Sequence, residues 1–192
     1  TFSAGKPHGV RLVIDSLRWW SQVIGVDGFR FDLAPALNRT GNMIDSALLA
    51  AITADPVLRQ LKLIAEPWDI SRYSLGEFHY PWREWNDYYR DAVRQFWLGD
   101  LARGYGEGVS ALASSLAGSS NIFYFRGPTS SINFITAHDG FTLNDLVTYQ
   151  EKQNLPNGEE NRDGNNTNRS WNVGIEGPTS ELTINQIRQS LK

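Results

Sequence analysis

Three largely apolar stretches of this chain are each followed directly by an acidic residue. The acids are Asp32 after residues 26–31, Glu66 after residues 61–65, and Asp139 after residues 132–138. A strand that ends in an acid can present its carboxylate at the rim of a sheet, so three such strands can bring three carboxylates together. Paired carboxylates at such a rim are the groups that hydrolyse glycosidic bonds, one as acid and base and the other as nucleophile.

The first acid has a basic neighbour on the same side of its strand. Side chains alternate along a strand, so Arg30 and Asp32 point to one side. Phe29 and Phe31 point to the other side, toward helices. A cation beside a carboxylate favours its ionised form, which is the form a nucleophile needs. The alternative is a structural Arg–Asp pair that ties the strand to a helix.

The second and third acids have different surroundings. Glu66 follows an apolar strand, and apolar neighbours favour a protonated carboxyl group that can act as a general acid. His138 and Asp139 can face one site only if their strand ends there, and Gly140 permits such a bend. Each acid also has a simpler interpretation, Glu66 as a helix cap or solvated rim carboxylate and Asp139 as a turn residue.

The elements that position these acids alternate between helices and strands. Apolar periodicity with proline starts and glycine stops predicts helices over residues 7–24 (ended by Gly25), 46–54 (capped by Asp45), 87–98 (ended by Gly99) and 105–117 (ended by Gly118), and a helix start near residue 180. Residues 82–85 predict a short strand, and residues 154–178 predict a long loop that is either functional or disordered. This alternation indicates an α/β fold with parallel strands, in which ligands bind at the carboxyl ends of the strands.

Composition narrows the class of protein. The 192 residues suggest one domain, and 41% apolar residues are enough for a core. A net charge of −3 makes nucleic acid and an anionic membrane surface poor partners, and no apolar run is long enough to span a bilayer. The chain has no cysteine, which excludes disulfides, cysteine metal ligands and a cysteine nucleophile. This composition fits a reducing compartment, and we expect a cytoplasmic protein.

Aromatic residues are abundant, at 12% of the chain with seven tryptophans. Most aromatic side chains fill cores, but an aromatic face can also stack on the apolar face of a sugar ring. Five tryptophans near predicted loops or element ends are candidates for that second role: Trp68, Trp82, Trp85, Trp97 and Trp171.

The sequence around the three acids resembles that of a known group of enzymes. The stretches Gly-Phe-Arg-Phe-Asp (28–32), Ala-Glu-Pro-Trp (65–68) and Ala-His-Asp-Gly (137–140) are similar to three of the four signature regions of the α-amylase clan of glycoside hydrolases. The longer segments at residues 26–34, 84–91 and 157–164 resemble the sequences of isoamylase-type and bacterial glycogen-debranching enzymes. The similarity spans nearly the whole chain.

This resemblance implies a (β/α)8 TIM barrel and a retaining mechanism on an α-glucan such as glycogen, a limit dextrin or a malto-oligosaccharide. It implies that Asp32 is the nucleophile, Glu66 the general acid and base, and Asp139 the residue that binds the distorted sugar. Arg30 would keep Asp32 ionised and His138 would bind the sugar. Further substrate contacts are expected from Trp68, Trp85, Asp87, Tyr89 and the loop 157–168. That loop lacks the ligand spacing of a calcium site, so we expect no metal or cofactor.

The resemblance also predicts what this chain lacks. No Asn-His pair occurs, although the fourth signature region of the clan ends in one. We therefore expect residues 1–192 to form a partial barrel of about strands four to seven, without the N-terminal β-sandwich and C-terminal β domains of the family. Exposed sheet edges and apolar strand faces would then favour self-association, and the fragment alone would be inactive.

Three functions remain open from the sequence. The first is hydrolysis of α-1,6 branch bonds, which we favour. The second is an α-1,4-acting amylase or transglycosylase of the same clan, because the three acids serve either bond. The third is a glucan-binding fragment without catalysis.

Overall fold

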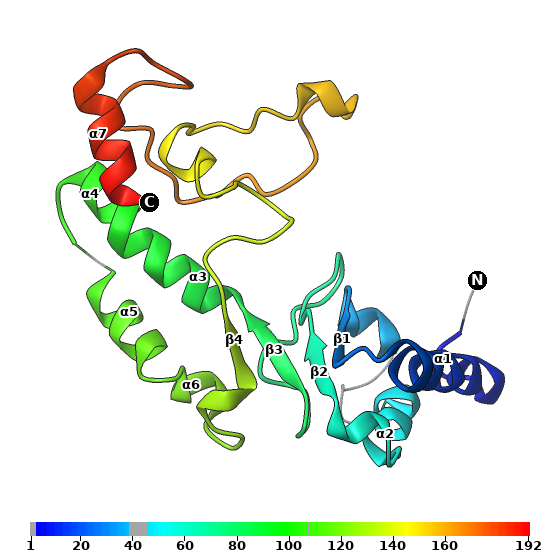
Figure 1. Ribbon diagram of the computed structural model, residues 1–192. Coiled ribbons are helices and arrows are strands. Elements are labelled where there is room, and N and C mark those ends of the chain that lie inside the picture. Colours follow the sequence, from blue (N-terminus) through cyan, green and yellow to red (C-terminus); the bar gives the residue numbers. More distant parts are fainter. Residues whose placement is uncertain (1–2, 39–45, 107) are drawn as a thin grey trace. The chain divides into compact units, whose positions relative to one another are not determined.

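A computed structural model describes residues 3–38, 46–106 and 108–192 of the chain (Figure 1). The chain forms two compact units. The first contains residues 1–86 and 118–132, and the second contains residues 87–117 and 133–192.

The first unit is built on a parallel sheet. Its strands follow the order β1 (Gly28–Phe31), β2 (Lys62–Ala65), β3 (Arg83–Asn86) and β4 (Ser131–Asn133) (Figure 1). Strand β2 pairs in parallel with β1 and with β3, and Ala65 lies opposite both Phe31 and Glu84. The α/β class with parallel strands is therefore confirmed, and Asp32 and Glu66 each follow the last residue of a strand as predicted.

The strand predicted before Asp139 is shorter than expected. Strand β4 ends at Asn133, so Asp139 does not lie at the end of a strand. Its continuation is blocked because the carbonyl of Ile135 accepts hydrogen bonds from the Arg94 side chain, at 2.9 Å from Nε. A carbonyl held in this way is withdrawn from a backbone ladder.

The helices of the first unit mostly follow the predicted limits. Helix α1 (Pro7–Trp19) continues into a π-helical turn, η1 (Trp20–Ile24), and Gly25 ends it with a φ of 84°. Helix α2 (Ala47–Ala54) is capped by Ser46, whose hydroxyl accepts a hydrogen bond from the Leu49 amide. Asp45, the predicted cap, lies outside the described residues. Shorter helical turns are η2 (Ala34–Asn38), η4 (Leu58–Gln60), α6 (Ser120–Phe123) and η6 (Pro128–Ser130).

The core of the first unit lies between its helices and the sheet. Phe29 and Phe31 point into it, as strand alternation predicts, and leave Arg30 on the opposite face. The buried members of this core are Leu17, Ala34, Leu48, Leu49, Ile52, Leu58, Leu63, Ala65, Phe78 and Trp82. The sheet is thereby fixed on one face, and its other face is available to polar side chains.

The second unit begins with a helical run that is longer than predicted. Helix α3 (Asp87–Arg94) continues through the π-helical turn η5 (Gln95–Gly99) into α4 (Asp100–Arg103). Gly99 therefore does not end the helix. It has a helical φ of −65°, and Gly104 ends the run instead, with a φ of 76°. Because Tyr105 and Gly106 follow the left-handed Gly104 and are not helical, helix α5 (Val109–Leu116) begins later than the predicted residue 105.

The remainder of the second unit is mostly loop. The predicted loop 154–178 contains only a short helical turn, η8 (Leu155–Asn157), and it follows another turn, η7 (Asp145–Val147). Helix α7 (Leu182–Leu191) comes last, as predicted. A small core of Leu98, Phe141, Leu146 and Val147 supports these segments. Within the described ranges, no helix has both the length and the apolar character needed to cross a membrane.

Candidate active site

One arginine in the first unit contacts two of the three predicted acids. The Nη1 atom of Arg30 donates to Oδ1 of Asp32 at 2.7 Å, and its Nη2 atom lies 3.0 Å from Oε2 of Glu66. The predicted Arg30–Asp32 contact is thus confirmed, and the contact with Glu66 was not foreseen. The Asp32 side chain is 65% exposed whereas that of Glu66 is 1% exposed, so the two carboxylates differ sharply in their access to solvent.

The turn after β1 encloses Glu66. The Leu33 amide donates to Oε2 of Glu66 at 2.7 Å, and the Ala34 amide donates to the Glu66 carbonyl at 3.0 Å. Leu33 adopts a φ of 44°, a left-handed conformation that is rare and costly for a residue with a branched side chain. The turn thereby directs an N–H group at a predicted catalytic carboxylate. Glu66 consequently has polar partners rather than the apolar surroundings expected from the sequence.

The ring of Trp85 packs against Arg30. The centre of the Arg30 guanidinium lies 4.3 Å from the centroid of the Trp85 ring, within the range of a cation–π contact. Trp85 lies on β3, and its neighbours on that strand, Glu84 and Asn86, are fully buried on the other side. The ring therefore holds the arginine that contacts both acids, whether or not it also contacts a sugar.

Two polar residues of β3 anchor the strand. Glu84 pairs with Arg126 and accepts a hydrogen bond from the Gly76 amide at 2.6 Å. Burial raises the pKa of Glu84, and the charge of Arg126 and the amide hydrogen bonds only partly offset this effect. Asn86 donates to the hydroxyls of Ser119 and Ser131, both at 2.9 Å. These contacts fix β3, and with it Trp85.

The other candidate tryptophans lie in different surroundings. Trp82 is only 2% exposed and its indole N–H donates to Thr53, so it is a core residue and the prediction of a sugar platform is wrong for it. Trp171 packs against the core of the second unit. Trp68 is half-buried and stacks on Tyr73, with ring centroids 6.5 Å apart and planes 9° apart. Trp68 follows Glu66 by two residues in the sequence, and its role as a sugar contact stays a prediction.

The third acid lies in the second unit, in a polar cavity of about 340 Å³. The wall on one side is the turn 138–141, and the opposite wall belongs to the loop 152–168. The side chains of His138 and Asp139 are more than half exposed and 3.5 Å apart at their closest N and O atoms. The structure therefore brings His138 and Asp139 together with the loop that the sequence proposed as a substrate wall.

Two buried residues hold the walls of this cavity in place. Arg94 is 3% exposed and donates both to the Ile135 carbonyl and to the Asn168 carbonyl, the latter at 3.2 Å. Burial, with the nearby charges of Arg90 and Arg169, lowers the pKa of Arg94 to about 10, so it stays protonated at neutral pH. Asn168 accepts a hydrogen bond from the Phe141 amide at 3.1 Å.

The turn that carries Asp139 depends on a glycine. Gly140 has a φ of 85°, and a Cβ atom at this position would lie 2.7 Å from Oδ1 of Asn168. A larger residue would therefore be strained and would displace the Asn168 side chain. The predicted bend at Gly140 is confirmed.

Asp87 and Tyr89, also predicted substrate contacts, lie in the first turn of α3 and are half-buried. They are not among the residues that line the cavity of Asp139 in the described part of the second unit. Their proposed roles therefore rest on the sequence motif alone.

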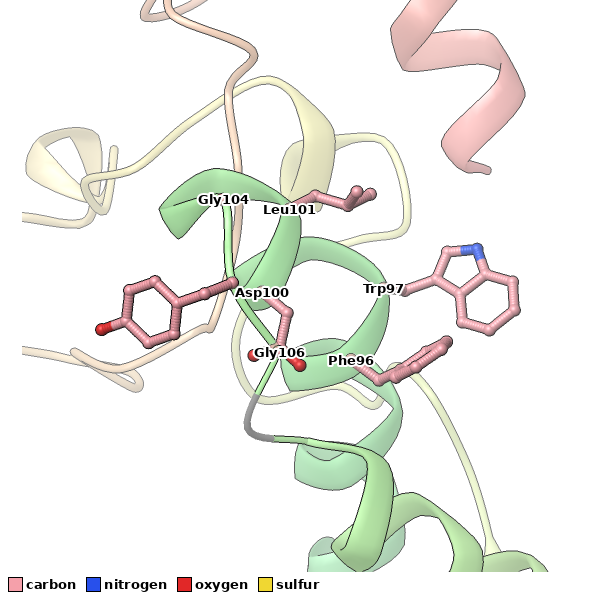
Figure 2. A pocket seen from close by; sticks show the side chains of 7 residues that line it. Phe96, Trp97, Asp100, Leu101, Gly104 and Gly106 are labelled. Atoms are coloured by element: carbon pink, nitrogen blue, oxygen red, sulfur yellow. The ribbon is translucent and has the colours of Figure 1, made fainter.

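A second, more apolar hollow of about 420 Å³ lies along η5 and α4 (Figure 2). Phe96, Trp97, Leu101 and Tyr105 line it, and Trp97 is about half exposed. Figure 2 shows the Asp100 side chain pointing to the backbone near Gly106. That carboxylate is engaged, because it accepts hydrogen bonds from the Gln95 side chain and the Gly108 amide, both at 2.8 Å. It is thus a structural group of the turn.

Sequence reasoning missed several residues of both sites. The Leu33 amide contacts the Glu66 side chain, and the Arg94 side chain contacts the carbonyls of Ile135 and Asn168. These partners are far apart in sequence, and a single sequence carries no signal for such contacts. Asp163 and Lys152 lie in or beside a loop whose asparagine and glycine content did indicate functional importance.

The parallel sheet carries acids after two adjacent strands, and one arginine is shared between them. Sequence relatives identify the kind of enzyme to which the chain is homologous. The chain is 50% identical over 194 residues to a glycogen operon protein GlgX homolog of Mycobacterium tuberculosis, covering 98% of this chain and 26% of that protein. It is 47% identical to a glycogen debranching enzyme of Erwinia tasmaniensis, covering 95% and 28%, and 46% identical to one of Salmonella typhi, covering 98% and 29%.

The chain is therefore homologous, over almost all of its length, to a segment of the bacterial glycogen debranching enzymes. It spans about a quarter of the length of these relatives. No family model matches the chain. Among solved structures, it resembles a pullulanase from Anoxybacillus crystallised with maltotriose, with a TM-score of 0.51, 28% identity, and coverage of 72% of this chain and 21% of that one.

Proposed function

We propose that this chain carries catalytic residues of a retaining glycoside hydrolase that cleaves α-1,6 branch bonds of an α-glucan such as glycogen or a limit dextrin. The observation that carries this proposal is the placement of Asp32 and Glu66 on one guanidinium. A nucleophile and a general acid must be held in fixed geometry around one sugar ring. The glycogen debranching relatives and the pullulanase with maltotriose support the choice of substrate.

The proposed reaction has two steps. In the first, a carboxylate oxygen of Asp32 bonds to the anomeric carbon while the bond to the 6-oxygen of the main chain breaks, and Glu66 gives its proton to that oxygen. In the second, Glu66 takes a proton from water as the water oxygen bonds to the anomeric carbon and the ester to Asp32 breaks. The solvent-accessible position of Asp32 and the enclosed position of Glu66 are compatible with these distinct roles.

The remaining roles are carried by sequence motifs. We assign to Asp139 the binding of the sugar hydroxyls in the oxocarbenium-like state and to His138 a hydrogen bond to the same sugar. Trp68, Trp85, Asp87 and Tyr89 stay proposed substrate contacts.

We further propose that the four parallel strands belong to a (β/α)8 barrel, as the similarity to the pullulanase suggests. An alternation of parallel strands and helices is what such a barrel requires.

The cytoplasmic location and the self-association of the isolated 192-residue chain also stay predictions.

The test uses the longest natural polypeptide that contains these 192 residues. Asp32→Asn and Glu66→Gln should each reduce the release of linear chains from a branched limit dextrin by at least about 10³-fold, because each removes a group that takes part in bond cleavage. Asp15→Asn is the matched control, since Asp15 is 60% exposed on α1 and pairs only with Arg11 among the contacts described. It should leave turnover unchanged.

The products decide between the functions. Release of linear chains without cleavage of linear amylose supports debranching, whereas cleavage of amylose identifies an α-1,4-acting enzyme. A wild-type protein that binds the dextrin without turnover would be a binding protein. Full turnover after either carboxylate substitution would reject the assigned roles.

A further inference from the structure

The hydrogen bonds between β1 and β2 follow a regular pattern up to Glu66. In a parallel pair, alternate residues of one strand bond to both neighbours of the residue opposite, so the bonds are evenly spaced. The Lys62 amide donates to the Asp27 carbonyl at 3.1 Å, and the Glu66 amide donates to the Phe31 carbonyl at 3.0 Å. Both bonds fit the register of the two strands. If the pattern continued, the Leu33 amide would donate to the Glu66 carbonyl.

The pattern breaks at Leu33. The Glu66 carbonyl accepts its hydrogen bond from the Ala34 amide instead, at 3.0 Å. One extra residue is thus inserted after β1, as in a β-bulge, and Leu33 takes up the insertion with its left-handed φ of 44°. Bulges are frequent next to active sites, where they redirect a group. Here the bulge releases the Leu33 amide from the backbone pattern.

The released amide contacts one particular oxygen of the Glu66 side chain. It donates to Oε2 at 2.7 Å, and Nη2 of Arg30 lies 3.0 Å from the same oxygen. Among the residues that the structure describes, no amide or side chain pairs with the other oxygen, Oε1. The two oxygens of this carboxyl group therefore have different surroundings.

This difference decides where a proton can reside on Glu66. A carboxyl oxygen can accept about two hydrogen bonds, and on Oε2 the amide occupies one of these positions while a positive charge lies beside it. A proton on Oε2 would therefore face both an N–H group and the Arg30 guanidinium, whereas a proton on Oε1 faces neither. The Glu66 side chain is only 1% exposed, so solvent does little to weaken this preference.

We propose that Glu66 transfers its proton through Oε1, and that Leu33 is a positioning residue whose amide reserves Oε2 as the acceptor. The proposal rests on the proposed function, because only there does Glu66 transfer a proton. In the first step the proton leaves Oε1 for the 6-oxygen of the main chain, and in the second step Oε1 takes a proton from water. The unfavourable backbone conformation of Leu33 is the energetic cost of this arrangement.

The test removes the Leu33 N–H group and keeps its side chain. Replacing Leu33 by its α-hydroxy analogue, through nonsense suppression in the longest natural polypeptide that contains this chain, turns the amide into an ester. Single-turnover rates are measured on a branched limit dextrin and on α-maltotriosyl fluoride. The ester should slow the dextrin reaction about tenfold or more, the effect of losing a hydrogen bond to a charged group. Fluoride release should stay within about threefold, because fluoride leaves without a proton.

Two further variants separate proton transfer from the stability of the turn. The α-hydroxy analogue at Ala34 removes the hydrogen bond to the Glu66 carbonyl but leaves the contact with Oε2, so it should not change the ratio of the two rates. Leu33→Gly keeps the amide and suits a positive φ, so its dextrin rate should stay within about threefold of wild type. Slowing of both substrates by the same factor in the Leu33 ester would overturn the proposal, as would no slowing.

A measurement without any variant keeps the proposal testable if the ester protein does not fold. Neutron diffraction from deuterium-exchanged crystals of the natural polypeptide, at a pH low enough to protonate Glu66, locates the deuteron directly. A deuteron on Oε1 is the expected result, and a deuteron on Oε2 would overturn the assignment.

Failure of this proposal is distinguishable from failure of the proposed function. If Asp32→Asn abolishes turnover while the Leu33 ester leaves the dextrin rate unchanged, only the role of Leu33 is rejected. If Asp32→Asn retains turnover, the proposed function itself is rejected, whatever the position of the deuteron.

Discussion

The Nη2 atom of Arg30 lies 3.0 Å from the Oε2 atom of Glu66, although Arg30 belongs to β1 and Glu66 follows β2. The same guanidinium donates to Asp32 through Nη1. A planar guanidinium can serve two carboxylates in fixed directions, which a lysine ammonium cannot do. Arg30 therefore sets the position of both carboxylates at once.

Replacing Arg30 by lysine should keep the charge and lose this geometry. We expect Arg30→Lys to lower kcat on a branched limit dextrin by about 10- to 100-fold, the loss of one charge-assisted hydrogen bond. Arg11→Lys provides the control, because Arg11 is 82% exposed and its partner Asp15 is also exposed. The measurement is kcat of both variants from steady-state kinetics. Wild-type kcat in Arg30→Lys would show that the shared contact has no role in turnover.

Trp85 should act on the rate through Arg30. A cation–π contact is worth about 0.5–2 kcal/mol, so Trp85→Ala should lower kcat by about 2- to 30-fold, and Trp85→Phe should recover part of the loss. Trp19→Ala, at a tryptophan of α1 that is 51% exposed, should leave kcat unchanged.

The split between kcat and KM distinguishes the two roles of Trp85. A sugar platform, as the sequence suggested, would raise KM with little effect on kcat. An increase in KM alone would therefore contradict the role that we infer from the Arg30 contact.

Gly28 is required by the close approach of β1 and β2. A Cβ atom on Gly28 would lie 2.4 Å from the Lys62 carbonyl oxygen. This distance is shorter than any contact that a side chain can make with a backbone atom that cannot move away. Gly28→Ala should lower the free energy of unfolding by about 1–3 kcal/mol, as measured by urea denaturation. Gly5→Ala, where a Cβ atom would meet no other atom within 4 Å, should change it by less than about 0.5 kcal/mol. Equal stability of the two variants would show that the strands separate without cost.

Local patterns in the sequence were sufficient to predict where Arg30, Asp32 and Glu66 lie on their strands or directly after them. Alternation along β1 placed Arg30 with Asp32, and the apolar run of β2 placed Glu66 after a strand. Such predictions succeed because side-chain direction in a strand depends only on parity. The contact between Arg30 and Glu66 could not be predicted, because it depends on the register between two strands.

The predictions from the sequence were wrong where contacts in the folded chain outweighed a local conformational preference. The strand expected to run up to Asp139 stops at Asn133, because the Ile135 carbonyl accepts hydrogen bonds from the Arg94 side chain. Gly99 was expected to end a helix, but a glycine is only permissive, and it keeps a helical φ where the chain continues to Arg103. Leu33 in a left-handed conformation contradicts its own propensity, which is typical of residues held at a functional site.

The stability of the first unit should depend on pH through Asp55. This carboxylate caps the turn η4 by accepting from the Val57 and Leu58 amides, and it pairs with Arg18 at 2.6 Å. Burial alone would raise the pKa of Asp55, but these hydrogen bonds and the charge of Arg18 outweigh burial and hold the pKa below its ordinary value of 3.8. A group whose pKa is lower in the folded state binds fewer protons there, so its contribution is complete above the unfolded pKa and is lost as the pH falls through the folded one.

Asp55→Ala should therefore lower the free energy of unfolding at pH 7 by about 1–2 kcal/mol, the usual effect of losing a capping carboxylate. The difference from wild type should shrink as the pH falls below about 4, because the wild-type carboxylate then becomes protonated. Urea denaturation at a series of pH values provides the measurement, and Asp15→Ala, at an exposed acid of α1, is the control. A difference that stays constant down to pH 2 would show that Asp55 stabilises the unit by packing, because only a contribution from its ionised form vanishes on protonation.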